Sequence, residues 1–261
     1  MYIVGHLLIT EKSGAFAPGE PIYSESALTI MLPDYVRCHD WGYRQCFTRN
    51  HLSRDGLLIR AHMLGDWFMH YGEISAEPKK VGWAYRRMGI YARRYHEFFS
   101  EAARRGLRED VPPADSVRGF SHTMMEFTLD TFLVEQGLFD SRFKSVQGAL
   151  GVLGLTDGLG SQQWIDKTIK SEEIFSSSSN ITADVTSYRE RVQKAKNPSE
   201  FAYRAGVRKF GLCPCDESIA LVRRFIRDGL REVSSQELSE VFHECSEFLR
   251  KWLLRTVAEG E

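Results

Sequence analysis

The chain has 261 residues, enough for one substantial hydrophobic core or two modest ones. Its 34 Lys and Arg residues nearly balance 35 Asp and Glu residues, for a net charge of −1. No overall electrostatic field therefore favours nucleic acid or an anionic membrane, and an anionic partner has to be met by a local patch.

The first ten residues and the cysteines indicate the compartment. The short apolar run at the start has no basic residue before it and is interrupted by His6, unlike a secretion signal. No stretch of about 18 apolar residues is present to span a bilayer. Five cysteines in a chain of this length indicate reduced thiols rather than a disulfide framework. We therefore expect a cytoplasmic protein with no membrane span.

Helical patterns dominate, so the sequence predicts an all-α helical bundle. A Gly- and Pro-rich loop at 13–21 follows the first apolar segment, and Leu32-Pro-Asp-Tyr35 is expected to open or enter a helix. The stretch from Leu57 to Tyr71 is nearly all apolar, and Gly72 stands at the expected C-terminal cap. This pattern predicts a buried helix.

Residues 79–105 form a basic amphipathic segment in which arginines alternate with aromatic residues. Such a segment could dock an acidic protein, a nucleic acid or a phosphorylated ligand through charge and stacking. The alternative is an amphipathic helix with a solvated basic face. Its arginines are Arg86, Arg87, Arg93, Arg94, Arg104 and Arg105.

Further helices are expected beyond a polar loop at 108–116. One fits between Gly119 and Gly137, and the Gly-rich stretch 148–160 and the serine-rich loop Ser176–Asn180 follow it. Asn197-Pro198 is typical of a helix start, and Ser234-Ser-Gln-Glu237 is a capping-box pattern. The last helix places apolar residues on one face: Leu238, Val241, Phe242, Cys245, Phe248, Leu249, Trp252 and Leu253.

A stripe of polar residues runs along the predicted buried helix as His62-Met-Leu-Gly-Asp66-Trp-Phe-Met-His70. Residues four apart share a helix face, so His62 and Asp66 can bind one metal ion. His70 is about 12 Å along the axis from His62, so one ion is not expected to bind both. His70 serves a second metal or the substrate, or it lies outside the site. A buried carboxylate costs several kcal/mol unless it is paired or bound to a metal.

The second helix carries a matching stripe, His122-Thr-Met-Met-Glu126-Phe-Thr-Leu-Asp130. A single pair of this kind is more often a surface hydrogen bond, but two such stripes on apolar helices favour metal binding. Facing helices of a bundle commonly build metal sites between them. We therefore predict a mononuclear or binuclear site where the two stripes meet.

Four short elements resemble, in order, the acyl carrier protein phosphodiesterase family, helical relatives of HD-domain phosphohydrolases. They are Ile3-Val-Gly-His6, Leu32-Pro-Asp34-Tyr-Val-Arg37, His62-Met-Leu-Gly-Asp66 and Asp130-Thr-Phe-Leu133. The resemblance covers roughly the first 135 residues. It implies metal-site or catalytic roles for His6, Asp34, His62, Asp66 and Asp130.

This sequence departs from that family at two places: Thr131 replaces a histidine, and Met63 and Leu64 replace two arginines. The resemblance therefore concerns the metal-ligand frame more than the acyl carrier protein substrate. Zinc-dependent phospholipases C are also similar, because they pair a His-x-x-x-Asp helix with a His-x-x-x-Glu helix. By that likeness His62, Asp66, His122 and Glu126 would be ligands.

The predicted function is that of a metal-dependent phosphodiester hydrolase that uses metal-activated water. We expect one helical domain over 1–261, with the metal-site core at about 1–137 and packing helices at about 184–258. The ion is Mn, Zn, Mg or Fe, Asp34 and Asp130 are further ligands or bases, and Arg37 could contact phosphate. His39-Asp40, the HD dipeptide, is more simply a loop or surface pair.

Two other functions compete with hydrolysis. Carboxylate and histidine stripes also build di-iron or di-manganese oxidoreductases, which typically need two Glu-x-x-His motifs, and only Glu240-Val-Phe-His243 qualifies here. The second alternative is a non-catalytic metal-binding or interaction protein that retains a degenerate hydrolase site. The departures at Thr131, Met63 and Leu64 fit that second alternative.

Overall fold

The computed structural model describes residues 3–14, 24–36, 38, 53–72, 82–137 and 194–258, with scattered positions between 167 and 190. These residues form helices and turns, and no strand occurs among them. The predicted all-α fold is confirmed. The predicted loops at 148–160 and Ser176–Asn180, as well as Arg37, His39 and His51, lie outside the described residues.

The chain divides into two compact units, and each unit is discontinuous in sequence. We call the first unit 1; it combines Met1–Gly5, Met69–Leu138 and Ala195–Phe242. Unit 2 combines His6–Phe68, Phe139–Lys194 and His243–Glu261. Each unit therefore combines segments that are far apart in the sequence.

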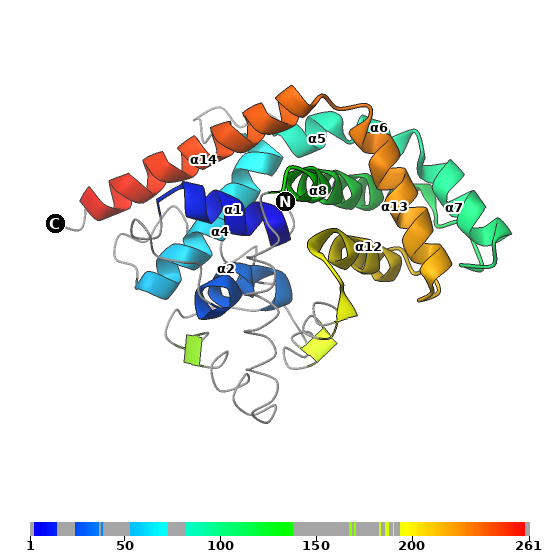
Figure 1. The fold of residues 1–261 in the computed structure, drawn as a ribbon, viewed down its shortest axis with the longest axis horizontal. Helices are drawn as coiled ribbons and strands as arrows, with labels where there is room; N and C mark the ends of the chain where they lie inside the picture. The colour runs from blue at the N-terminus through cyan, green and yellow to red at the C-terminus, as the bar shows by residue number, and fades with distance from the viewer. Residues whose placement is uncertain are drawn as a thin grey trace. The chain divides into compact units, whose positions relative to one another are not determined.

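Unit 1 is built around α8 (Val117–Glu135), whose residues from Phe120 to Leu133 are all buried except His122. A helix that is apolar around most of its circumference has to be covered on every side. Figure 1 shows α12 and α13 beside α8. The helices that contact it are α5 (Trp83–Arg87), α6 (Gly89–Ala92), α7 (Tyr95–Arg104), α12 (Pro198–Lys209) and α13 (Asp216–Leu230).

Local capping chemistry sets the start of α12 as the sequence predicts. Asn197 Oδ1 accepts the backbone N–H of Glu200 at 2.9 Å, and Pro198 takes the first helical position. Proline suits that position because its missing N–H would have had no partner inside the helix. The predicted helix start at Asn197-Pro198 is confirmed.

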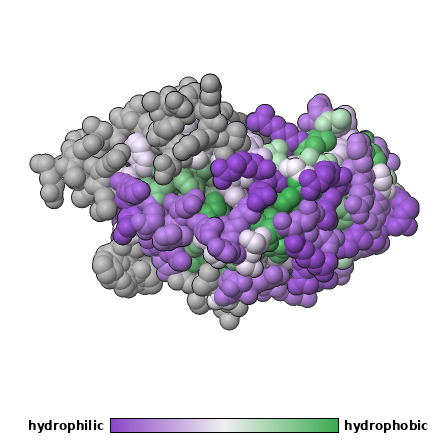
Figure 2. Space-filling model, turned by 90° about the horizontal axis from the view of Figure 1, so that it is seen from above, coloured by the Kyte–Doolittle hydropathy of each residue, from purple (hydrophilic) through white to green (hydrophobic). Residues whose placement is uncertain are grey.

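The described part of the basic segment, residues 82–105, forms three helices, with breaks at Met88 and at Arg93-Arg94. Four of its six arginines pair with acidic side chains of unit 1. The pairs are Arg87–Glu237, Arg93–Glu232, Arg94–Glu232, Arg94–Asp228, Arg105–Glu101 and Arg105–Glu217. Hydrophilic residues cover most of the described surface on the face in Figure 2. These pairs within unit 1 use much of the positive charge that a docking partner would need, so they favour the alternative of an amphipathic face without a partner. A docking partner stays a prediction.

The start of α14 (Ser235–Ala258) keeps half of the predicted capping box. Ser234 Oγ accepts the backbone N–H of Glu237 at 3.0 Å. The Glu237 carboxylate does not close the box, because it accepts from Trp83 Nε1 at 2.8 Å and Arg87 Nε at 2.6 Å. This carboxylate therefore joins α5 to α14 within unit 1.

We expect Glu237→Ala to lower the free energy of unfolding by about 1–2 kcal/mol, because each lost hydrogen bond is worth about 1 kcal/mol and the Trp83 N–H loses its acceptor. Urea denaturation followed by circular dichroism measures the change. Gln236→Ala is the control, since Gln236 bonds only to exposed Glu240 on its own helix. Equal stabilities of the two variants would contradict this role of Glu237.

The described helices of unit 2 come from α1 (Ile3–Lys12), α2 (Ser24–Val36), α4 (Arg54–Tyr71) and the later part of α14. The Phe68 and Phe248 rings lie 5.1 Å apart, and the Cys245 thiol donates to the Gly65 carbonyl. These contacts pack α4 against α14 inside the unit.

Two predicted helix boundaries have different outcomes. The helix ending at Gly72 is confirmed, since α4 ends at Tyr71 and Gly72 has φ +79°, a left-handed conformation that favours glycine. Leu32–Tyr35 lies inside α2 instead of at its start, because the helix begins at Ser24 and includes Pro33 near its end. Among the described residues, no helix has the length and apolar character that crossing a bilayer requires.

Candidate metal centres

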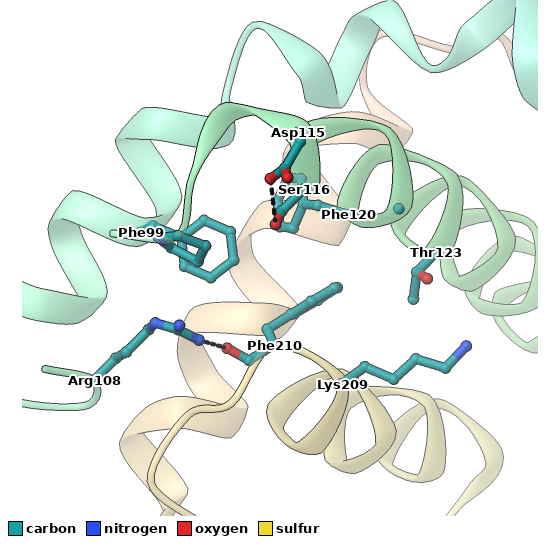
Figure 3. A pocket seen from close by; sticks show the side chains of 10 residues that line it. Phe99, Arg108, Asp115, Ser116, Phe120, Thr123, Lys209 and Phe210 are labelled. Carbon is teal, nitrogen blue, oxygen red and sulfur yellow. Dashed lines mark hydrogen bonds between the residues drawn. The ribbon is translucent and has the colours of Figure 1, made fainter. Parts of the chain in front are cut away.

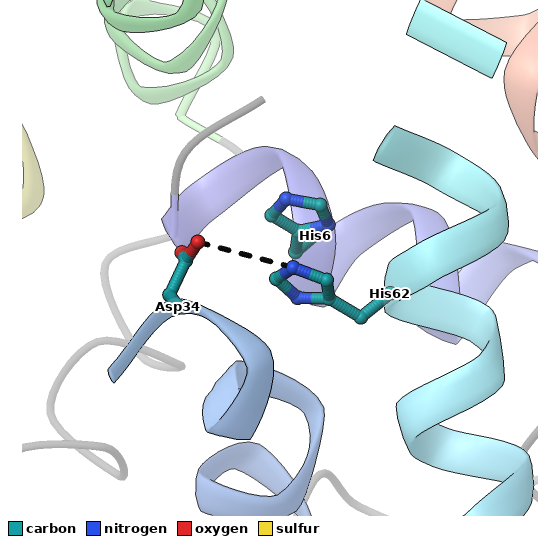
Figure 4. Close-up of side chains that lie close together, drawn as sticks. All are labelled: His6, Asp34 and His62. Atoms are coloured by element: carbon teal, nitrogen blue, oxygen red, sulfur yellow. Dashed lines mark ion pairs between the residues drawn. The ribbon is translucent and has the colours of Figure 1, made fainter. Parts of the chain in front are cut away.

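The first group of candidate ligands, group A, consists of His6 from α1, Asp34 from α2 and His62 from α4. One ligand atom from each residue lies within 4.8 Å of the others. The imidazole rings of His6 and His62 stack with centroids 3.6 Å apart, and His62 Nε2 is 3.9 Å from Asp34 Oδ1 (Figure 4). Three segments that are far apart in sequence therefore bring their donors together inside unit 2.

Burial decides the charge state of His6 in group A. His6 is 1 % exposed, and among the described residues neither of its ring nitrogens has a hydrogen-bond partner. Burial first, and the neighbouring His62 second, hold the pKa of His6 well below its ordinary value of 6.5, although Asp34 and Asp66 act in the opposite direction. A neutral imidazole is the form that binds a metal ion.

The low pKa of His6 predicts that the metal-free protein loses stability as the pH falls below about 6.5. In that range the unfolded chain binds a proton at this histidine and the folded protein does not, so acid favours unfolding. Denaturant titrations between pH 7.5 and 5.5 measure the loss. His6→Gln should flatten the profile, whereas His96→Gln, at an exposed position, should not. Parallel profiles for wild type and His6→Gln would refute the assignment.

The orientation of the group A rings bears on how an ion would fit. The two planes differ by only 8°, and each nitrogen lone pair lies in its own ring plane. Parallel rings at this spacing cannot both point at one ion, so one ring has to turn about its Cβ–Cγ bond. That torsion has a broad energy minimum in histidine, so the intrinsic cost of the turn is small.

The other two residues implied by the family resemblance lie in different surroundings. Asp66 is 4 % exposed, and its charge acts on His6 within unit 2. Asp130, in unit 1, accepts the backbone N–H groups of Val4 and Gly5 at 2.9 and 3.1 Å. A carboxylate at that position satisfies the first N–H groups of α1 and complements the helix dipole. The structure thus gives Asp130 a helix-capping role, and a role as ligand or base stays a prediction.

The second group, group B, consists of His70, His122 and Glu126 in unit 1. Glu126 Oε1 lies 3.7 Å from His70 Nε2 and 3.5 Å from His122 Nε2, and the two Nε2 atoms are in contact. In a tetrahedral site with bonds of about 2.0–2.1 Å, ligand atoms stand about 3.4 Å apart. The histidine-to-carboxylate spacings therefore suit a bound ion, provided that the two histidines separate.

Group B is open on one side. The His122 side chain is 25 % exposed, against 8 % for His70 and 9 % for Glu126. The Tyr85 ring packs against both histidines, with centroids 5.5 Å from His70 and 5.8 Å from His122, and the Arg118 guanidinium lies 5.2 Å from the Tyr85 ring. The sequence contained no signal for Tyr85, because its contacts depend on how α5 packs against α8.

Opposing effects set the charge of Glu126. Burial alone would raise its pKa. The charge of the chain's N-terminus, the charge of His122 and the hydrogen bond from His70 together hold the pKa well below its ordinary value. Lys209 adds to this effect. The carboxylate is therefore ionised at neutral pH, as a metal ligand has to be.

The structure divides the residues of the predicted stripes between the two groups. His70 joins His122 and Glu126, as the matching of the stripes predicted in part, whereas His62 joins His6 and Asp34. The expectation that one ion would not bind both His62 and His70 agrees with this division. Both groups could hold a metal ion, and both consist of donors that bind divalent transition metals.

Comparisons of this chain with models of protein families, with curated proteins and with solved structures give no match. The functional argument therefore rests on the two groups of candidate ligands and on the order of the sequence motifs.

Proposed function

We propose that this protein is a metal-dependent phosphoester hydrolase whose ion is bound by His6, Asp34 and His62. The observation that carries the proposal is the meeting of these three side chains from α1, α2 and α4 within 4.8 Å, at a buried position in unit 2. Burying polar side chains costs free energy, and a bound ion would offset part of that cost.

The order of the sequence motifs supports the same assignment. The resemblance to acyl carrier protein phosphodiesterases selected His6, Asp34 and His62 from short elements up to 56 residues apart, as their numbering shows. Helix periodicity could not have selected His6 or Asp34, which lie on other helices than His62. Of the five residues that the resemblance implies, three lie together in group A, which supports the proposal.

The residues of group A differ in what they can do. His6 and His62, both buried and the former neutral, would hold the ion, and Asp66 adds negative charge that favours a cation. Asp34 is 20 % exposed and is the member of the group nearest to solvent. A bound divalent ion lowers the pKa of water and offsets charge on phosphoryl oxygens. Arg37, three residues after Asp34, is proposed to contact the phosphate.

The test is reconstitution followed by hydrolysis. Chelator-treated protein is loaded separately with Zn²⁺, Mn²⁺, Mg²⁺ or Fe²⁺, and cleavage of bis-p-nitrophenyl phosphate and of natural phosphodiesters is followed. We expect activity that chelation removes and one or more of the ions restores. Protein that binds an ion and cleaves none of the substrates would support the non-catalytic alternative instead.

Group B supports a second candidate function. Two histidines and one carboxylate with an open side are also the donor set of non-haem Fe(II) oxygenases. Oxygen consumption by the iron-loaded protein, abolished in His122→Ala and retained in His62→Ala, would favour an oxidoreductase. Phosphodiester cleavage with the opposite dependence on these two residues favours the hydrolase.

A further inference from the structure

Unit 1 contains a cavity of about 480 Å³ whose lining includes none of the candidate metal ligands. It lies between the start of α8, the end of α12 and the loop after α7 (Figure 3). Sites for small molecules usually measure about 300–1,000 Å³. The cavity therefore has the size of a site for one small organic molecule.

Three phenylalanine rings form one wall of this cavity. The Phe120 centroid lies 5.3 Å from that of Phe99 and 4.9 Å from that of Phe210, and the remaining pair is 6.3 Å apart. All three rings are buried and tilted against one another, an arrangement that favours fixed positions. A rigid aromatic wall beside an open space suits a flat apolar group.

Arg108 is held in place at one end of the cavity. Its Nη1 donates to the Phe210 carbonyl at 2.7 Å, its Nε donates to the Asp110 carboxylate at 3.0 Å, and its guanidinium lies 5.5 Å from the centre of the Phe99 ring. Gly211 makes room for it, since a Cβ there would lie 2.7 Å from Nη1. The arginine is thus a fixed element of the wall that adds positive charge.

Lys209 brings a second positive charge, extending along the cavity away from Arg108 in Figure 3. Its ammonium nitrogen lies 5.8 Å from the centre of the Phe127 ring. The acidic lining residue is Asp115, which accepts a hydrogen bond from Ser116 and lies across the cavity from both cations in Figure 3. The charge of Lys209 also acts on Glu126. The Lys209 side chain is exposed, so its ammonium can pair with an anionic group at that end of the cavity.

We propose that this cavity binds a small molecule with a flat aromatic body and an anionic group. The aromatic body packs against Phe99, Phe120 and Phe210, and the anionic group pairs with Lys209. Apolar walls with a few well-placed polar groups are the usual composition of such sites. This site does not depend on the hydrolase function proposed above.

The test uses 1-naphthalenesulfonate, an aromatic anion with no ester to hydrolyse, and isothermal titration calorimetry. We expect saturable binding of one molecule per chain, with 1-naphthol and inorganic sulfate each binding at least about tenfold more weakly. Lys209→Met should weaken the sulfonate by about tenfold, as loss of one charge-assisted contact does. Arg231→Met, at an exposed arginine outside the lining, should bind like wild type.

Gly119 supplies a variant that fills the cavity without disturbing α8. It belongs to the lining, and an added Cβ would meet nothing within 4 Å. Gly119→Leu should therefore fold normally and lose binding by at least about tenfold, whereas Gly119→Ala should bind nearly as well as wild type. Absence of binding to wild type, or binding that neither Gly119→Leu nor Lys209→Met weakens, would overturn the proposal.

Discussion

Alanine at His62 is expected to remove the ion from group A and to lower phosphodiester hydrolysis by more than about a hundredfold. His62 is fully buried, stacks on His6 at 3.6 Å and faces Asp34 at 3.9 Å, so no other side chain can take its place without rearrangement. Loss of residues that merely orient ligands typically costs about 10–100-fold in affinity or activity. Loss of a ligand itself should cost more.

Measuring the metal content together with the rate of hydrolysis shows which of the two groups is responsible for hydrolysis. His62→Ala should bind one ion fewer per chain than wild type, and so should His122→Ala, but only the first should abolish hydrolysis. The double variant should bind neither ion. His96→Ala, at an exposed position on α7, is the matched control and should keep both ions and the full rate. Wild-type metal content in His62→Ala would contradict the assignment of group A.

The helices could be predicted where the signal was local. Gly72, Asn197 and Ser234 act on backbone groups within four residues, so their meaning does not depend on the rest of the fold. The predicted start of α2 at Leu32–Tyr35 was wrong, because the helix begins at Ser24. Pro33 is typical of a helix start, yet it lies inside α2 near its end, where the helix lacks one backbone donor.

The candidate site could be predicted only in part, because periodicity shows which residues share a face and not which helix covers that face. The stripe on α4 correctly marked His62, Asp66 and His70 as buried polar residues. Their partners come from separate parts of the chain, and only the ordered motifs pointed to His6 and Asp34. Contacts such as that of Tyr85 with the group B histidines left no trace in the sequence.

Alanine at Gly82 is expected to lower the free energy of unfolding by about 2–3 kcal/mol, as forced overpacking does, and to weaken ion binding at group B. Gly82 N–H donates to the His70 carbonyl at 2.8 Å, and an added Cβ would lie 2.4 Å from the His70 carbonyl carbon. Both contacts involve backbone, which cannot swing aside as a flexible side chain can. Relief of the overlap has to shift His70, and its imidazole would move with the backbone.

Two further variants identify the cause of the Gly82 effect. Gly82 also precedes α5 as its N-cap, and serine is a better N-cap than alanine. Gly82→Ser should nevertheless be as unstable as Gly82→Ala, because both carry the same Cβ; recovery with serine would assign the loss to capping. Gly119→Ala, in open space on α8, should instead raise stability by up to about 1 kcal/mol. Urea denaturation measures the stability of all three variants. Zn²⁺ titration of the two Gly82 variants then shows whether ion binding by His70, His122 and Glu126 depends on this one backbone contact.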